Sequence, residues 1–320
     1  MARPLTSYIG KRLLLLIPTL LGVSVLTFLL IHLIPGDLVT ILLGITASQN
    51  EQTRQALIHA LHLDRPLAVQ YLLWLGDVLR GDLGHSLVTG FSVRDELARS
   101  YPVTLQLALM AMAIALAVGV PLGVLAATRA GRALDASTRV FSLLFISAPA
   151  FFIGTVVIIG GARYAPWLPT LGHLPFTESP ARSLGAMLPA ASSLGLAISA
   201  IIARFTRSSM LEVLGQDFVR TARAKGVADR GVVYKHALRN ALIPVVAMAG
   251  TQFVYLIGGA VIIEEVFALP GMGRLVVNAI YQRDYTMIQG AVLLLTSAAV
   301  LVNLTLDLLY HLIDRRILYA

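Results

Sequence analysis

The amino-acid sequence predicts an all-α membrane protein with six transmembrane helices and both termini in the cytoplasm. Three observations point to this fold class. Hydrophobic residues make up 57% of the 320 residues and charged residues only 13%, which is about half the charged fraction of a typical soluble domain. Six apolar segments reach the roughly 20 residues that a membrane-spanning helix requires. Lys and Arg gather on alternate connections between these segments, as in cytoplasmic loops.

The first predicted span resembles a signal peptide, because Lys11 and Arg12 precede it. Its apolar run is longer than a signal core of roughly 7–15 residues, and it ends in PGD (35–37) without a small-residue cleavage site. We therefore expect a retained helix. The six predicted spans are 13–34, 102–128, 140–161, 185–203, 238–263 and 289–312.

Glycines and prolines inside the spans predict how the helices pack and bend. Gly119 and Gly123 form a GxxxG pattern in the second span, which permits the close approach of a neighbouring helix. We expect this pattern to serve packing. Prolines interrupt helical hydrogen bonds, so kinks are expected at Pro121, Pro149, Pro189 and Pro244.

The placement of charge predicts the orientation. With the N-terminus in the cytoplasm, 16 of the 25 Lys and Arg residues lie on the inner side, where the net charge is +11, against −2 on the outer side. This is the positive-inside pattern, so the net charge of +8 reflects membrane orientation and no nucleic-acid partner is expected. The absence of cysteine excludes disulfides, thiolate nucleophiles and Cys-based metal sites.

The outer loop between the first and second spans, 35–100, is long enough to be structured. Ser48 and Glu51 have the spacing of a capping box and predict a helix that the sequence DRP (64–66) ends. A second, amphipathic helix is expected over 69–79. It could lie on the outer bilayer surface, receive a partner, or pack against the chain's own helices, and the sequence favours none of these.

The inner loop 204–240 is longer than a connection between neighbouring spans needs. Gly226 is predicted to end its first helix, and a second short helix is expected over 230–240, ending near Pro244. The resulting basic projection could lie on anionic lipid or dock into a soluble partner, and periodicity does not choose between the two. The first helix is predicted from one stripe of apolar residues at helical spacing, namely Leu211, Leu214, Phe218 and Ala222.

Several sequence runs carry more specific information. The inner loop contains ARFTRSSMLEVL (203–214), FVRTARAKG (218–226) and KHALRNALIP (235–244). Other runs along the chain are IPGD (34–37), LDRPL (63–67), VQY (69–71), GDLG (81–84), FALPGMGR (267–274) and RDY (283–285). In this order and spacing, the runs resemble the ABC-importer permeases, above all the branch that imports dipeptides, oligopeptides, glutathione and nickel complexes.

The resemblance implies a permease subunit, not an enzyme, of an ATP-driven importer in the bacterial cytoplasmic (inner) membrane. Its expected partners are a homologous second permease, two cytoplasmic ATPases, an extracytoplasmic solute-binding protein and the lipid bilayer. The expected cargo is di- or oligopeptides, with glutathione or nickel complexes as the alternative. A self-sufficient secondary transporter or channel is the alternative from another class. It would require several charged residues in the spans or an internal repeat, and neither is evident.

The resemblance also implies where the functional residues lie. The predicted organisation is 1–34 for the cytoplasmic N-terminus and first span, 35–100 for the outer loop, and 101–320 for a five-helix permease core with the coupling loop 204–240. The expected ATPase-coupling residues are Asp217, Arg220, Thr221, Ala222, Arg223, Ala224, Lys225 and Gly226, supported by Lys235, His236, Arg239 and Asn240. The expected outer-gate or binding-protein contacts are Asp82, Glu264, Glu265, Pro270, Gly271 and Arg274.

A few positions depart from the family pattern. Arg220 stands where many importers have glutamate, and an arginine at this position is similar to the usual form of the peptide branch. Leu38 stands where relatives often repeat proline, and Leu269 where tryptophan is common. The short outer loop 163–184 lacks the insertion of some dipeptide permeases, which favours members that import glutathione or nickel.

No sequence motif for catalysis or nucleotide binding is present. The chain has no GxxxxGK[ST] phosphate loop, so ATP and Mg are expected in the partner ATPases and no cofactor in this chain. HExxH and GxSxG are also absent. A metal site at His59, His62 and Asp64 is a weaker interpretation than a polar helix face. Asn303 and Asp307 share a face of the last span and could line a polar path, but we favour a structural hydrogen bond for Asp307.

Overall fold

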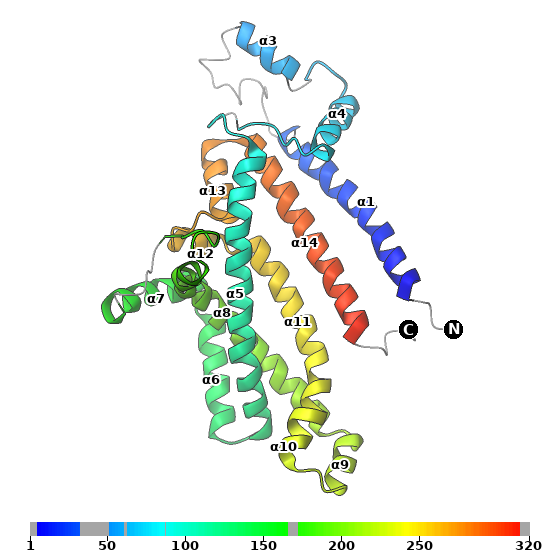
Figure 1. Ribbon diagram of the computed structural model, residues 1–320, viewed down its shortest axis with the longest axis vertical. Coiled ribbons are helices and arrows are strands. Elements are labelled where there is room, and N and C mark those ends of the chain that lie inside the picture. The colour runs from blue at the N-terminus through cyan, green and yellow to red at the C-terminus, as the bar shows by residue number, and fades with distance from the viewer. Residues whose placement is uncertain (1–4, 33–50, 61–62, 87, 166–171, 314–320) are drawn as a thin grey trace. The chain divides into compact units, whose positions relative to one another are not determined.

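The structure, a computed structural model, describes residues 5–32, 51–60, 63–86, 88–165 and 172–313 (Figure 1). The secondary structure of these residues is helical, apart from an isolated bridge between His85 and Ser92. The chain divides into two compact units. The core unit comprises Thr104–Pro270 with Met1–Ala2 and Val302–Ala320, and the flanking unit comprises Arg3–Val103 with Gly271–Leu301.

The flanking unit contains the outer-loop helices. Tyr71 of α4 shares a hydrogen bond of 2.8 Å with Ser24 of α1, and its ring lies edge-on to Phe28 at 5.5 Å. Of the placements open for the amphipathic helix, these contacts favour packing against the chain's own helices. Ser48 lies outside the described residues. The helices of the unit are α1 (Leu5–His32), α3 (Glu51–Ala60), α4 (Leu67–Leu79), the start of α5 (Val93–Thr128), α13 (Met272–Gln282) and most of α14 (Tyr285–Ile313).

The core unit contains the rest of α5 and a run of helices in which α8 contacts α6, α7 and α11. Among the long helices of the described residues, α8 is the most buried, since 72% of its apolar 18-residue stretch lies inside the structure. The helices of the unit are α6 (Ala133–Ser147), α7 (Ala150–Tyr164), α8 (Pro180–Leu214), α9 (Asp217–Ala224), α10 (Asp229–Gly231), the π-helical turn η1 (Val232–Ala237), α11 (Leu238–Gly259) and α12 (Val261–Val266).

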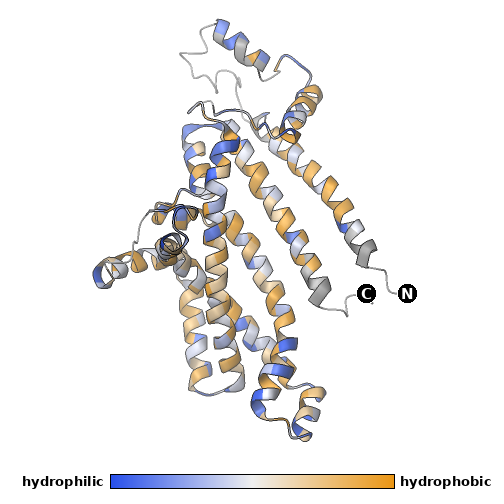
Figure 2. Ribbon diagram, viewed as in Figure 1, coloured by the Kyte–Doolittle hydropathy of each residue, from blue (hydrophilic) through white to orange (hydrophobic). Residues whose placement is uncertain are grey.

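Among the described residues, five helices are long and apolar enough to cross a membrane, or six spans if the bent pair α6–α7 counts as one. Hydrophobic residues dominate these long helices in Figure 2. The predicted kink at Pro149 is confirmed, and it is strong: the chain bends by 102° between α6 and α7, so the predicted span 140–161 is a bent pair of helices. Pro149 explains the break, since the residue before a proline avoids the helical conformation, and Ala148 is extended with φ −77° and ψ 127°.

The predicted close packing at the GxxxG pattern is confirmed. A Cβ atom on Gly119 would lie 2.7 Å from the Ser199 carbonyl oxygen, and one on Gly123 would lie 2.5 Å from the Thr206 Cβ. Gly195 of α8 makes a third close approach, because its Cβ would lie 2.8 Å from the Ala111 carbonyl oxygen. The backbones of α5 and α8 therefore meet where side chains would separate them, as small residues allow in membrane helix pairs.

Candidate functional site

The coupling loop 204–240 contains a helix break that was not predicted from the sequence. α8 ends at Leu214 and α9 starts at Asp217, with Gly215 and Gln216 between them. The prediction of one continuous helix is therefore wrong, and its apolar stripe fails at Phe218, whereas Leu211, Leu214 and Ala222 do contribute to one buried cluster. Phe218 is 40% exposed, and Val219 is fully buried in its place. The stripe has the spacing of a helix, but the break changes the direction of the chain and hence the buried face.

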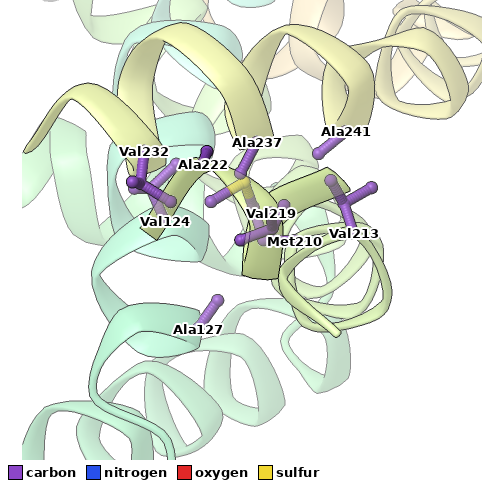
Figure 3. Close-up of a cluster of buried hydrophobic side chains, with 9 residues drawn as sticks. All are labelled: Val124, Ala127, Met210, Val213, Val219, Ala222, Val232, Ala237 and Ala241. Atoms are coloured by element: carbon purple, nitrogen blue, oxygen red, sulfur yellow. The ribbon is translucent and has the colours of Figure 1, made fainter. Parts of the chain in front are cut away.

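A cluster of buried apolar side chains anchors α9 (Figure 3). Val219 and Ala222 of α9 pack there against Met210 and Val213 of α8. Most members of the cluster are Ala or Val, and these short side chains allow the helices to pack closely. Its members are Val124, Ala127, Met210, Val213, Val219, Ala222, Val232, Ala237 and Ala241.

The prediction that Gly226 ends this helix is confirmed. Its φ is +76°, a left-handed value that favours glycine. The Gly226 N–H donates to the Arg223 carbonyl at 2.9 Å, and the Val227 N–H donates to the Ala222 carbonyl at 3.2 Å. These bonds satisfy carbonyl groups that the end of a helix leaves without partners.

The chain then continues into the long helix α11 without the separate second short helix that the sequence predicted. α10, η1 and α11 follow one another directly, and α11 passes through Pro244 to Gly259. The prediction that a helix ends near Pro244 is therefore wrong, because Pro244 lies inside α11. The Asn240 side-chain amide donates to the His236 carbonyl at 2.8 Å, four residues earlier in the same run.

The surface of α9 opposite the cluster is exposed and polar. Arg220 pairs with Asp217 at 2.6 Å, and Arg223 with Asp229 at 3.7 Å. Both pairs are exposed, so they contribute little to stability. The predicted coupling residues that are exposed, on α9 and directly after it, are Asp217, Arg220, Thr221, Arg223, Ala224, Lys225 and Gly226, whereas Ala222 is buried. Of the supporting residues, Lys235, Arg239 and Asn240 are exposed and His236 is half-buried.

A buried ion pair next to this loop was missed by the sequence analysis. Asp135 of α6 is 1% exposed and accepts two hydrogen bonds from Arg207 of α8, at 2.6 and 2.9 Å. The Gly131 N–H donates to the same carboxylate at 3.0 Å, and Arg139 lies 3.5 Å away. This bidentate contact fixes the position of α6 relative to α8. Asp135 and Arg207 lie 72 positions apart, and no sequence pattern indicates that they form a pair.

The predicted outer residues of the core unit lie at α12 and just after it. Glu264 is fully buried and accepts a hydrogen bond of 2.6 Å from the Thr104 hydroxyl. Glu265 and Pro270 are exposed. Because a buried carboxylate needs hydrogen-bonding partners, Glu264 is suited to holding α12 in place, and Glu265 to contact with a partner.

The predicted outer residues of the flanking unit are differently placed. Asp82 is exposed and accepts a hydrogen bond of 2.9 Å from the Gly84 N–H, so it shapes its own turn. Gly271 is buried and Arg274 half-buried. The buried Asp284, which accepts a hydrogen bond from the Ser86 hydroxyl, was not predicted as a site residue. The sequence signal that could have indicated Asp284 is the RDY run (283–285).

The remaining candidates are less well defined. Asn303 is exposed on α14, and the Asp307 side chain lies outside the described residues, so the polar path they were predicted to line stays a prediction. His59 lies 3.9 Å from Asp64, and His62 is outside the described residues. Among the residues that the structure describes, no group of three His, Asp or Glu side chains is arranged to hold a metal.

Comparison with known proteins identifies the family. Residues 5–108 match the N-terminal part, and residues 119–319 the main part, of the binding-protein-dependent transport system inner membrane components. The chain is 41% identical to a putative peptide transport system permease of Brucella abortus (strain 2308), over 98% of this chain and 100% of the relative. It is equally identical to the glutathione transport system permease GsiC of Escherichia coli O6:H1 and to a probable peptide ABC transporter permease of Sinorhizobium fredii, each over 98% of this chain and 99% of the relative.

A solved structure shows the same fold. The inward-facing MetNI methionine ABC transporter aligns with a TM-score of 0.55 and 19% identity, over 68% of this chain and 96% of that one. Its fold agrees with the helical membrane architecture described above. The chain therefore belongs to the family of binding-protein-dependent transport system inner membrane components and is a permease subunit rather than an enzyme.

Proposed function

We propose that the chain is one of two membrane-spanning subunits of an ATP-driven importer in the bacterial inner membrane, and that its cargo is a peptide. A homologous permease would complete the pathway, and an extracytoplasmic solute-binding protein would deliver the cargo. Two cytoplasmic ATPase chains would bind ATP and Mg. Family membership supports this assembly and argues against the alternative of a self-sufficient transporter or channel.

The observation that carries the proposal is the two-sided character of α9. One side of α9 packs into the buried cluster, and the opposite side presents exposed polar residues. A helix of this kind suits a groove on another protein. Because α8 and the α10–η1–α11 run are joined to the same cluster, closure of the ATPases would displace these membrane helices. Two arrangements with different affinities for the ATPases would then alternate.

A charge-reversal variant tests the coupling. Arg220→Glu combined with Arg223→Glu removes only exposed ion pairs, so membrane insertion and folding should persist. We expect loss of ATPase co-purification and of uptake in cells. The control is Arg182→Glu, which reverses an exposed charge near the start of α8. Normal uptake by the double variant, or equal loss in the control, would refute the coupling role of α9.

The relatives leave two cargoes to distinguish. The permeases described for peptides and for glutathione have the same 41% identity to this chain, and glutathione is itself a tripeptide. Calorimetric titration of the cognate solute-binding protein with dipeptides, oligopeptides, glutathione and nickel chelates separates them. Binding of several peptides supports the peptide proposal. Binding of glutathione alone, or of a nickel chelate alone, would replace it with that cargo.

A further inference from the structure

We propose that a hollow between α6 and α8 binds the phosphate group of a membrane phospholipid. The hollow has a volume of about 590 Å³. It lies beside the Asp135–Arg207 ion pair, and Pro244 of α11 also lines it. The side chains that matter to the argument are Arg139, Ser142 and Leu143 of α6 and Arg204, Arg207 and Glu212 of α8.

The hollow carries more positive than negative charge. Asp135 is shared by two arginines, Arg207 at 2.6 Å and the 58%-exposed Arg139 at 3.5 Å, so one carboxylate faces two cations. Among the described residues, no carboxylate lies within 4 Å of Arg204. Guanidinium groups present several N–H donors in a planar fork, which matches the oxygens of a phosphate.

A second observation comes from the wall of the hollow. Ser142 is 1% exposed, and its hydroxyl has no hydrogen-bond partner in the structure. Buried hydroxyl groups almost always have a partner. Because Ser142 lines the hollow, an anionic oxygen bound between the arginines could accept this hydrogen bond.

The surroundings favour a lipid over a free anion. Leu143 lines the hollow and is 64% exposed, and Val140 and Leu144 on the same helix are 55% and 63% exposed. An acyl chain would therefore find an apolar surface directly beside the cations. Basic pockets between membrane helices are characteristic sites for phospholipid head groups.

Two carboxylates also face this region. Asp135 is balanced by Arg207. Glu212 also lines the hollow and is exposed on α8, so water weakens the interactions of its charge. It reduces the attraction for phosphate without cancelling it, because the three arginines Arg139, Arg204 and Arg207 outnumber the two carboxylates.

The test uses the assembled transporter purified from membranes, with retained phospholipid quantified per transporter by mass spectrometry. Arg204→Gln should lose a phospholipid that the wild type retains, whereas Arg132→Gln, an exposed arginine outside the hollow, should retain it. Ser142→Ala removes no intramolecular hydrogen bond, so the fold should be unaffected. In titration with phosphatidylglycerol, it should weaken binding by about tenfold, the equivalent of about 1.4 kcal/mol.

Three results would overturn the proposal. The first is unchanged lipid retention by Arg204→Gln together with unchanged affinity in Ser142→Ala. The second is displacement of the lipid by inorganic phosphate, which would make the site one for a free anion. The third is displacement of the lipid by a transported peptide, which would make the hollow part of the cargo path.

Discussion

The close approach of α5 and α8 gives a quantitative prediction. Gly123→Ala would place a Cβ atom 2.5 Å from the Thr206 Cβ and 2.7 Å from the Ala203 carbonyl oxygen. Ordinary carbon contacts are about 3.5–4.0 Å, so the two helices must separate by about 1 Å. Neither neighbouring atom can rotate away, because one is a backbone atom and the other is bonded directly to the backbone.

Such overpacking costs about 1–3 kcal/mol. The helix propensity of alanine offsets about 1 kcal/mol of this, so a net loss of up to about 2 kcal/mol is expected. At about 2–4 °C per kcal/mol, the unfolding temperature of the solubilised transporter should fall by several degrees. The assay is thermal unfolding followed by intrinsic tryptophan fluorescence.

A matched glycine in a neighbouring helix provides the control. A Cβ atom on Gly258 of α11 would meet no heavy atom within 4 Å, so Gly258→Ala gains helix propensity without a clash. It should be neutral or slightly stabilising, by about 0.5–1 kcal/mol. Equal unfolding temperatures for Gly123→Ala and Gly258→Ala would show that α5 and α8 do not pack as closely as described.

Three further predictions concern the coupling and outer regions. Asp135→Asn should lower the unfolding temperature more than Asp217→Asn, because only the first removes a buried partner of an arginine; equal effects would contradict this. Gly226→Ala should cost about 1–2 kcal/mol through backbone strain at φ +76° alone, and Gly226→Asn less, as measured by thermal unfolding; a larger loss with Asn would refute the left-handed turn. Ser86→Ala should cost about 1–3 kcal/mol by leaving a buried carboxylate short of a donor, detectable as faster proteolysis of the outer loop, whereas an unchanged cleavage rate would argue against that contact.

The membrane-spanning helices were the part of the fold that the sequence predicted best. A helix that crosses lipid must be long and apolar, so hydropathy alone located most of the spans that the structure contains. The close packing of α5 was equally predictable from the GxxxG pattern, because a glycine without a side chain allows the backbone of a neighbouring helix to approach. Gly226 was predictable for the same reason, since glycine adopts left-handed conformations without strain.

The errors occurred where a local pattern was extended through a change of direction. Phe218 continues the apolar spacing of α8, but the break at Gly215 gives the buried position to Val219. Periodicity records only the spacing along a helix and cannot detect that the helix has ended. The Ser86–Asp284 contact joins residues 198 positions apart, and no local rule connects them.

The π-helical turn η1 sets how α10 is rotated relative to α11. A π-helical turn contains about one residue more than an α-helical turn, and each residue rotates a helix by about 100°. The six residues of η1 lie between α10 and α11. Removing one residue there would leave the hydropathy of the span intact yet rotate α10 relative to α11 by about a quarter of a circle, which would pull Val232 and Ala237 out of register with the buried cluster. In this segment the number of residues constrains the protein as strictly as their identities do.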